Sequence, residues 1–317
     1  MVGDTIRYLS KSDVRSLELS ISDIADAIER ILKAKQANTA WSSPNSVISV
    51  AQGSRSVSFH SAGLDPAYSM HKTLGLSSAN SERGLPHMGG LINVHDVQTG
   101  LPLAVIECTE ITGLRTAALS LLATRYLAPP KMETIGFIGA GQQAMFHLKM
   151  LAKNYPFKRA FVYEPEERCS EALVQDCRLI GLKPTTARHW QKVLEESDVL
   201  VTSLPDGPGF QPFLDASYVP RRTLILSVDS ARSWLQKSLL SLDRLVVDDL
   251  NSHAKNRFIT AKAPTEDLST LISAGEQTTL NVKSGFFFAG IALADLAAVG
   301  IALRAARARN IGHCLPV

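Results

Sequence analysis

The stretch TIGFIGAGQQAMFHL, residues 134–148, decides the fold of this chain. It begins with a short apolar run that suits a buried strand of a parallel sheet, and it continues with the apolar spacing of a helix. Between the two, six residues fit the pattern G-x-G-x-x-G/A: Gly139, Ala140, Gly141, Gln142, Gln143 and Ala144.

Each small residue of this pattern has a physical reason. The first glycine permits a tight turn, the second lets a pyrophosphate approach the backbone, and the small last residue lets helix and strand pack closely. The N–H groups at the start of the helix would bind phosphate oxygens. The pattern predicts a dinucleotide-binding turn, although strand–helix turns rich in glycine also occur without a ligand.

An acidic residue follows at the position that an adenosine ribose requires. The apolar segment RAFVYE predicts the next strand and ends at Glu164, about twenty residues after the glycines. A carboxylate there accepts a hydrogen bond from the ribose 2′-OH and repels a 2′-phosphate, which favours NAD over NADP. The alternative is a solvated glutamate that opens the turn EPEER.

Several strand ends in the second half of the chain are expected to meet at one edge of a sheet. The helix-like ARHWQKVLEES and the strand-like DVLVTSL, RTLILSVDS and DRLVVDDL continue the alternation, which predicts a doubly wound, Rossmann-type parallel sheet. Ligands gather at the carboxyl ends of such strands. The cofactor-binding candidates are therefore the glycine turn, the loop of Thr202, Ser203 and Leu204, and Val228.

Asp229 places a carboxylate at the end of an otherwise apolar strand, at the edge where a ligand would bind. Two interpretations stay open. Asp229 is either an acid or base that acts on a ligand, or the N-cap of the following segment, which is a common role of aspartate.

Composition limits the class of protein. The 317 residues suggest about two domains, with 45% hydrophobic and 20% charged residues as in ordinary globular proteins. A net charge of +3 without a dense Lys/Arg block gives little support to a nucleic-acid or membrane-surface partner. Cys108, Cys169, Cys177 and Cys314 form neither a CxxC pair nor a zinc spacing, so we expect no metal site, and reduced thiols in a cytoplasmic protein. The polar N-terminus carries no apolar signal core.

The segment GFFFAGIALADLAAVGIA, residues 285–302, approaches the length of a membrane span. Asp295 lies at its middle, where a charge in hydrocarbon is costly. The segment also divides into a strand-like FFF and a helix after Gly290, so a helix buried between layers is the expectation.

The first third predicts an α+β half that differs from the parallel sheet. Strand-like pieces precede a hairpin, GLINVHDVQTGLPLAVIEC, and a helix, EITGLRTAALSLLATRYLA. Arg115 lies on the apolar face of that helix, and a buried arginine needs an anion. The partner is either a structural carboxylate, Glu107 or Glu110, or the carboxylate of a substrate. Lys72 is a second cation in an apolar run, unless it is an ordinary exposed strand lysine.

These segments together resemble the ornithine cyclodeaminase/mu-crystallin family. The likeness is carried by Lys72, the run GLP…GGLINVHD…TGLPLAVIE, ITGLRTAA, IGAGQQA, Asp229, VVDD at 246–249 and GIALADLAA at 290–298. It implies a substrate-binding and dimerisation domain (1–118 with about 303–317), an NAD-binding Rossmann domain (119–302) and a homodimer. It also implies that Lys72 and Arg115 bind the carboxylate of a small amino or imino acid, and that Asp229, with Lys72, is catalytic.

The chain departs from the family pattern in its substrate half. Pro44-Asn45 stands where a Pro-Arg is usual, and SARSWLQ replaces a Gly-Lys-x-Glu stretch after Asp229. Three hypotheses follow: an NAD-dependent oxidoreductase that transfers hydride at Cα, a cyclodeaminase that uses NAD catalytically and releases ammonia, and a non-catalytic ligand binder in the manner of mu-crystallin. The retained cations and Asp229 favour an enzyme, and the missing arginine and lysine disfavour the cyclodeaminase.

Overall fold

The computed structural model describes residues 4–51, 53–165, 170–205, 209–275 and 282–317. The chain forms two compact units, the first made of Met1–Ala118 with Gly290–Val317 and the second of Leu119–Ala289. From the sequence we expected the chain to return to the first unit at about residue 303, whereas in the structure the first unit resumes at Gly290. The apolar run 285–302 divides at Gly290, which has a φ of +89°, so that its strand belongs to the second unit and its helix to the first.

The first unit is built on a mixed sheet in which the pair β1–β7 is parallel and the other pairs are antiparallel. Its strands in spatial order, with β3 paired to β4, are β16 (His313–Pro316), β1 (Thr5–Leu9), β7 (Pro102–Glu107), β6 (Met88–Asp96), β5 (Tyr68–Ser77), β4 (Ser54–Gly63), β2 (Ala40–Ser42) and β3 (Ser46–Ala51). Its helices are α1 (Lys11–Ser16), α2 (Ile21–Gln36), the 3₁₀ helix η1 (Ser78–Arg83), the start of α3 (Cys108–Leu127) and α9 (Ala292–Ala308).

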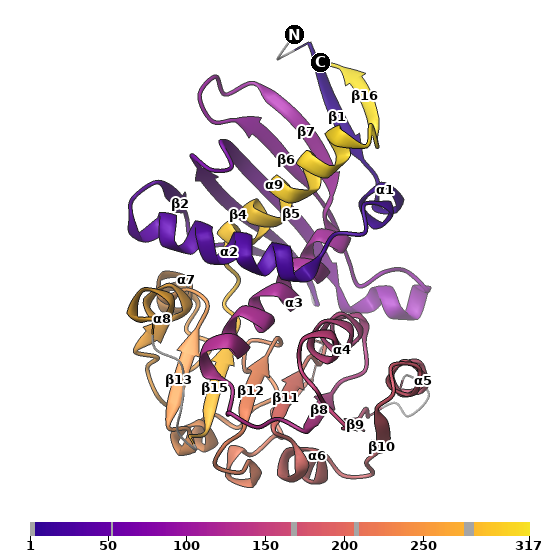
Figure 1. Ribbon diagram of the computed structural model, residues 1–317, viewed down its shortest axis with the longest axis vertical. Coiled ribbons are helices and arrows are strands. Elements are labelled where there is room, and N and C mark those ends of the chain that lie inside the picture. The colour runs from indigo at the N-terminus through magenta and orange to yellow at the C-terminus, as the bar shows by residue number, and fades with distance from the viewer. Residues whose placement is uncertain (1–3, 52, 166–169, 206–208, 276–281) are drawn as a thin grey trace. The chain divides into compact units, whose positions relative to one another are not determined.

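The helices α2 and α9 pack on one face of this sheet, as Figure 1 shows in indigo and yellow. Strand alternation explains which side chains they cover, because Ile92 and Val94 of β6 are fully buried whereas Leu91, which directly precedes Ile92, is 44% exposed. The predicted hairpin is β6–β7. Asp96 Oδ1 closes its turn by accepting hydrogen bonds from the backbone N–H groups of Gln98 and Thr99.

The second unit confirms the predicted doubly wound fold, because every strand pair in its sheet is parallel. In spatial order its strands are β10 (Lys183–Thr186), β9 (Arg159–Tyr163), β8 (Thr134–Ile138), β11 (Val199–Thr202), β12 (Leu224–Ser227), β15 (Ser284–Phe287), β13 (Arg244–Val247) and β14 (Glu266–Asp267). Its helices are the end of α3, α4 (Gln142–Asn154), α5 (Glu171–Leu179), α6 (Trp190–Glu196), η3 (Ala216–Tyr218), η4 (Gln236–Ser241), α7 (Leu250–Asn256) and α8 (Leu268–Ala274).

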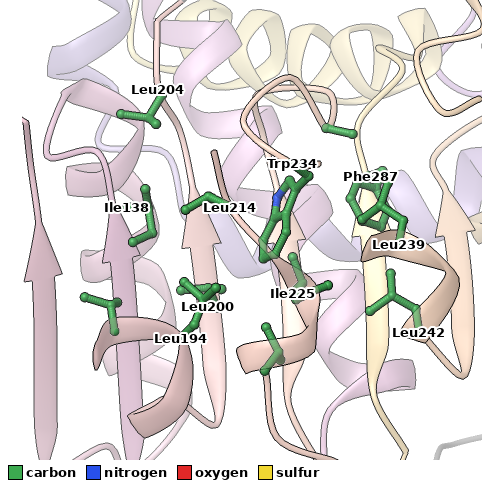
Figure 2. Close-up of a cluster of buried hydrophobic side chains, with 14 of the residues drawn as sticks. Ile138, Leu194, Leu200, Leu204, Leu214, Ile225, Trp234, Leu239, Leu242 and Phe287 are labelled. Carbon is green, nitrogen blue, oxygen red and sulfur yellow. The ribbon is translucent and has the colours of Figure 1, made fainter. Parts of the chain in front are cut away.

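A cluster of buried hydrophobic side chains covers part of this parallel sheet. Figure 2 shows the fully buried Trp234 lying against the central strands, with Ile225 of β12 and Phe287 of β15 close by. Parallel strands covered on both faces are expected to be apolar throughout, and the four residues of β11 and of β12 are all buried. This core fixes the strand ends that carry the candidate site.

Two further expectations concern thiols and membranes. Cys108, Cys177 and Cys314 are free, and Cys169 lies outside the described residues. Over the described ranges, no helix has the length and apolar character needed to cross a membrane.

Candidate functional site

The glycine turn of the second unit follows β8 as predicted. Gly139 has a φ of +93°, a conformation that favours glycine, and its N–H donates to the carbonyl of Tyr163 at 2.9 Å. A Cβ at this position would lie 3.0 Å from the carbonyl oxygen of Ser203. Backbone crowding therefore requires the first glycine of the motif and joins the turn to the ends of β9 and β11.

The second glycine leaves room for a ligand. A Cβ built on Gly141 would meet no atom within 4 Å, and Gly141 is the N-cap of α4, which begins at Gln142. Two buried polar atoms near this region, Gln143 Oε1 and Ser203 Oγ, have no hydrogen-bond partner among the described residues. Open backbone at a helix N-terminus and unpaired polar atoms suit the phosphates of a dinucleotide.

Glu164 is not the solvated residue of the alternative interpretation. Its Oε2 accepts a hydrogen bond of 2.7 Å from the backbone N–H of Ala140, inside the glycine turn. The carboxylate therefore lies against the turn, and its role as a ribose-binding acid stays a prediction. Residues 166–168, which complete EPEER, lie outside the described part of the chain.

The ends of β11 and β12, which the sequence also predicted to bind the cofactor, are linked to the glycine turn through backbone hydrogen bonds. The N–H of Ser203 donates to the carbonyl of Ile138 at 2.9 Å, and the N–H of Val228 donates to that of Thr202 at 2.9 Å. Leu204 is 5% exposed and belongs to the hydrophobic cluster. The parallel register of β8, β11 and β12 thus aligns the predicted cofactor-binding residues along one edge of the sheet.

Asp229 lies at the same edge, and three hydroxyl groups bind its carboxylate. Thr202 and Ser227 donate to Oδ1 at 3.0 and 2.6 Å, and Ser233 donates to Oδ2 at 2.5 Å. No backbone N–H donates to this carboxylate among the described residues, so the interpretation as an N-cap is wrong. The hydroxyls of Thr202 and Ser227 come from adjacent strands, and together with Ser233 they hold a buried carboxylate in one orientation.

The backbone after Asp229 is strained. Ser230 and Ala231 have φ values of 55° and 59°, in the left-handed region that non-glycine residues rarely adopt. The N–H of Ala231 donates to the Ser227 hydroxyl at 3.1 Å, which helps to hold the turn. Strain of this kind persists where surrounding contacts enforce it and is frequent at functional sites.

In the first unit, Lys72 is fully buried on β5. Its Nζ donates to Asp295 Oδ1 at 2.8 Å and lies 5.2 Å from the centre of the Phe59 ring. The interpretation as an exposed strand lysine is wrong, because the side chain is 0% exposed. Burial lowers the pKa of Lys72, and the negative charge of Asp295 opposes that shift.

Arg115 is also buried, and its partner is again Asp295. Its Nε lies 3.2 Å from the same Oδ1, although the angle does not make a hydrogen bond. Neither Glu107 nor Glu110, the two structural partners considered from the sequence, binds it. Glu107 accepts from the backbone N–H and hydroxyl of Thr109, and Glu110 pairs with Arg15.

Sequence reasoning missed Asp295 as a member of this cluster. The feature that could have identified it is its charge, because Asp295 is the one charged residue in the apolar run 285–302. A carboxylate that α9 buries completely needs a cation, and the sequence offered Arg115 as a buried cation and Lys72 as a candidate for a second.

The cluster of Lys72, Arg115 and Asp295 carries two positive charges and one negative charge. Cys108, which also faces Lys72, adds no negative charge, because burial raises the pKa of its thiol to about 11. The terminal nitrogens of Arg115, Nη1 and Nη2, donate no hydrogen bond to a described residue. An uncompensated positive charge in apolar surroundings suits the binding of an anion.

No group of three or more His, Cys, Asp or Glu side chains that could hold a metal ion is found in the part of the chain that the structure describes. Each unit thus has its own candidate region: the strand edge with the glycine turn and Asp229 in the second unit, and the cluster of Lys72, Arg115 and Asp295 in the first.

Comparisons with known proteins identify relatives of this chain and folds similar to it. Over 96% of both chains, the protein is 26% identical to an alanine dehydrogenase of Archaeoglobus fulgidus. Its fold is similar to that of Δ1-pyrroline-2-carboxylate reductase of Thermococcus litoralis in complex with NADH and L-proline, with a TM-score of 0.88 and 24% identity over 97% of this chain and 99% of the other. It is similar to an archaeal alanine dehydrogenase dimer with bound NAD, with a TM-score of 0.87 and 23% identity over 98% and 99%. Residues 7–272 match the model of the ornithine cyclodeaminase/mu-crystallin family, and the chain therefore belongs to this family.

Proposed function

We propose that this protein is an NAD-dependent oxidoreductase that acts on a small amino or imino acid and transfers hydride at Cα. The observation that carries the proposal is the buried cluster in which Lys72 and Arg115 share the single carboxylate of Asp295. Its excess positive charge suits a substrate carboxylate, which all amino and imino acids possess.

The second unit would hold the cofactor. The N–H groups at the start of α4 would bind the pyrophosphate, and Glu164 would accept a hydrogen bond from the adenosine ribose. Thr202, Ser203 and Val228 would border the cofactor at the carboxyl ends of the strands. When bound, NAD supplies or accepts the hydride.

Lys72 and Arg115 would orient the substrate by its carboxylate. Charge-assisted hydrogen bonds from Nζ and from the guanidinium fix the position of Cα, and such positioning lowers the barrier to a transfer between two bound molecules. Apolar surroundings strengthen these bonds because little water competes for the carboxylate.

Asp229 would move the proton on the substrate nitrogen or on an attacking water. Its three hydroxyl partners would keep the carboxylate in a fixed orientation during that step. Lys72 would hold the substrate carboxylate, while the acid or base role belongs to Asp229.

Related proteins support the proposal. The reductase of Thermococcus litoralis binds NADH and L-proline, and the archaeal alanine dehydrogenase binds NAD as a dimer. For this chain we propose the same class of cofactor and a homodimer joined through the first unit. We also propose a cytoplasmic location, because Cys108, Cys177 and Cys314 are free thiols.

Net turnover of NADH tests the function. The purified protein is incubated with NADH, ammonia and a panel of 2-oxo acids, and separately with cyclic imino acids, while the absorbance of NADH is followed. We expect one NADH consumed for each amino acid formed. Ammonia released from a diamino acid without net change in NADH would instead identify a cyclodeaminase.

A non-catalytic ligand binder is the second candidate. The observation that favours it is the engagement of both carboxylate oxygens of Asp229 by protein hydroxyls. Binding of a small carboxylate and NADH without turnover of any substrate in the panel, at any pH tested, would favour this candidate over the oxidoreductase.

A further inference from the structure

Asp295 contacts both buried cations of the first unit through one oxygen. Lys72 Nζ lies 2.8 Å and Arg115 Nε 3.2 Å from its Oδ1. Its other oxygen, Oδ2, is buried and has no hydrogen-bond partner among the described residues. The polar contacts of this carboxylate are therefore with the two cations. They form even though a fully buried oxygen without a hydrogen-bond donor costs free energy.

We propose that Asp295 is the positioning residue of the substrate-carboxylate site: it holds the Lys72 ammonium and the Arg115 guanidinium side by side so that both bind one anion. This inference rests on the proposed function, since the anion is the carboxylate of the amino or imino acid. Asp295 itself, having the same charge, would not touch that carboxylate.

The first step of the argument is geometric. Two cations in apolar surroundings repel each other strongly, and flexible side chains would separate without a shared anion. Asp295 Oδ1 counters this repulsion and engages Arg115 through Nε. The terminal nitrogens Nη1 and Nη2 then keep their donors for a second carboxylate, in the fork geometry that guanidinium offers.

The second step concerns the protonation of Lys72, because a neutral amine binds a carboxylate weakly. Burial lowers the pKa of Lys72, Arg115 lowers it further, and Asp295 raises it. The groups that face the ammonium from the neighbouring elements are Asp295 on α9, Arg115 and Cys108 on α3, Phe59 on β4 and Ile92 on β6. Of these, Asp295 is the group whose charge favours the ammonium form, since the Cys108 thiol stays protonated.

The third step is the charge that remains. One carboxylate between two cations leaves a single positive charge, so the cluster retains affinity for one further anion. A second buried carboxylate would cancel that charge, and no carboxylate at all would leave the cations repelling each other. Asp295 thus sets both the geometry and the net charge of the site.

The experiment measures how substrate carboxylates bind as a function of pH. Calorimetric titrations of pyruvate, L-alanine and L-proline into the NADH-loaded protein run from about pH 6 to about pH 10. For Asp295→Asn we expect affinity to fall at least about tenfold at pH 8, and the alkaline loss of binding to begin at least about one pH unit lower than in the wild type. The affinity for NADH itself should not change.

Two matched variants separate positioning from a general effect on stability. Asp295→Glu keeps the charge and should keep the pH at which binding is lost, with lower affinity because the longer side chain displaces the cations. Glu110→Gln removes a carboxylate from α3 that pairs with Arg15, and should bind carboxylates like the wild type. A purely structural role for Asp295 would lower the melting temperature without moving the pH dependence.

If Asp295→Asn does not fold, the double variant Lys72→Met with Asp295→Asn replaces it. This variant removes one charge of each sign and leaves Arg115 as the cation of the cluster. We expect weaker carboxylate binding at all pH values and no alkaline loss of binding.

The outcomes distinguish this inference from the proposed function. A wild-type protein that binds NADH but none of the carboxylates overturns both. A wild-type protein that binds a carboxylate, together with an Asp295→Asn variant of the same affinity and pH dependence, overturns the role of Asp295 alone. Where only the double variant folds, wild-type affinity and pH dependence in that variant overturn the roles of Lys72 and Asp295 together.

Discussion

The Nζ of Lys72 lies 2.8 Å from Oδ1 of Asp295, a residue 223 positions further along the chain. Both side chains are completely buried. Removing one partner of such a pair typically costs about 3–5 kcal/mol, because the other charge remains buried without compensation. The pair therefore links β5 to α9 and constrains where an anion can bind beside it.

Arg115→Ala should weaken the binding of substrate carboxylates at least about tenfold, since a charge-assisted hydrogen bond contributes about 1.5–3 kcal/mol. The variant should fold, because it leaves Lys72 and Asp295 as a balanced pair. Titration of pyruvate or L-proline into the NADH-loaded protein measures the loss.

Arg15→Ala provides the control for that experiment, because Arg15 pairs with Glu110 and is largely exposed. NADH affinity should stay unchanged in both variants. Equal carboxylate binding by Arg115→Ala and the wild type would assign Arg115 a structural role only.

NAD(H) should bind at least about tenfold more tightly than NADP(H), because a 2′-phosphate beside the Glu164 carboxylate places like charges together. Fluorescence titration with NADH and NADPH measures the ratio. Glu164→Gln should lower this ratio of affinities by improving NADPH binding. Equal affinities in the wild-type protein would mean that Glu164 does not face the ribose.

Asp229→Asn should lower kcat by about two to four orders of magnitude, the usual contribution of a general acid or base. Carboxylate binding and NADH binding should change little, since neither depends on Asp229. Steady-state rates and calorimetry on the same preparation separate the two effects.

Asp249→Asn is the matched control for this prediction. Asp249 accepts from the N–H of Ser252 as the N-cap of α7, and asparagine caps a helix about as well as aspartate. Activity should be retained. An Asp229→Asn variant as active as this control would count against Asp229 as the acid or base.

Acid should destabilise the protein through His147. The residue is buried on α4, where Nδ1–H donates to the Gln143 carbonyl and Nε2 accepts from the Ser120 hydroxyl, each at 2.7 Å. Burial lowers the pKa of His147 to about 4. An unfolded histidine takes up a proton near pH 6.5, so the unfolded state binds more protons between these values and stability falls as the pH drops.

This difference in pKa between the folded and unfolded states corresponds to a loss of about 3 kcal/mol in the free energy of unfolding between pH 7 and pH 4. Urea unfolding at several pH values measures it. His147→Gln should be less stable at pH 7 but show a flatter pH dependence. His189→Gln, at an exposed position, should keep the wild-type slope, and a wild-type slope in His147→Gln would refute the assignment.

We expect a homodimer joined through residues before about Leu119. Exposed hydrophobic residues gather on strands of the first unit, among them Ile48 at 63% and Leu91 at 44% exposure. Light scattering should give twice the mass of the chain, and Leu91→Glu should shift the measured mass toward that of a single chain. Leu179→Glu, on α5 of the second unit, should leave it unchanged. A wild-type monomer at micromolar concentration would contradict this prediction.

The sequence by itself determined the elements whose causes are local. The glycine turn, the strands around it and the hairpin closed at Asp96 follow from steric demands and apolar spacing within a few residues. The same reasoning predicted that Arg115 is buried, because helical spacing fixes its face. Lys72 alternates with Met70 and Leu74 on β5, so its burial was also readable from the strand pattern.

Only the tertiary structure decided the partners of the charged groups. Arg115 meets Asp295 and not the nearby Glu107, because α9 returns to the first unit and brings a carboxylate from the far end of the chain. Asp229 is held by Thr202 because strand register aligns β11 with β12. Local spacing sets which face a side chain occupies. The identity of its partner depends on which segments pack together, and that is fixed by the burial of the whole chain.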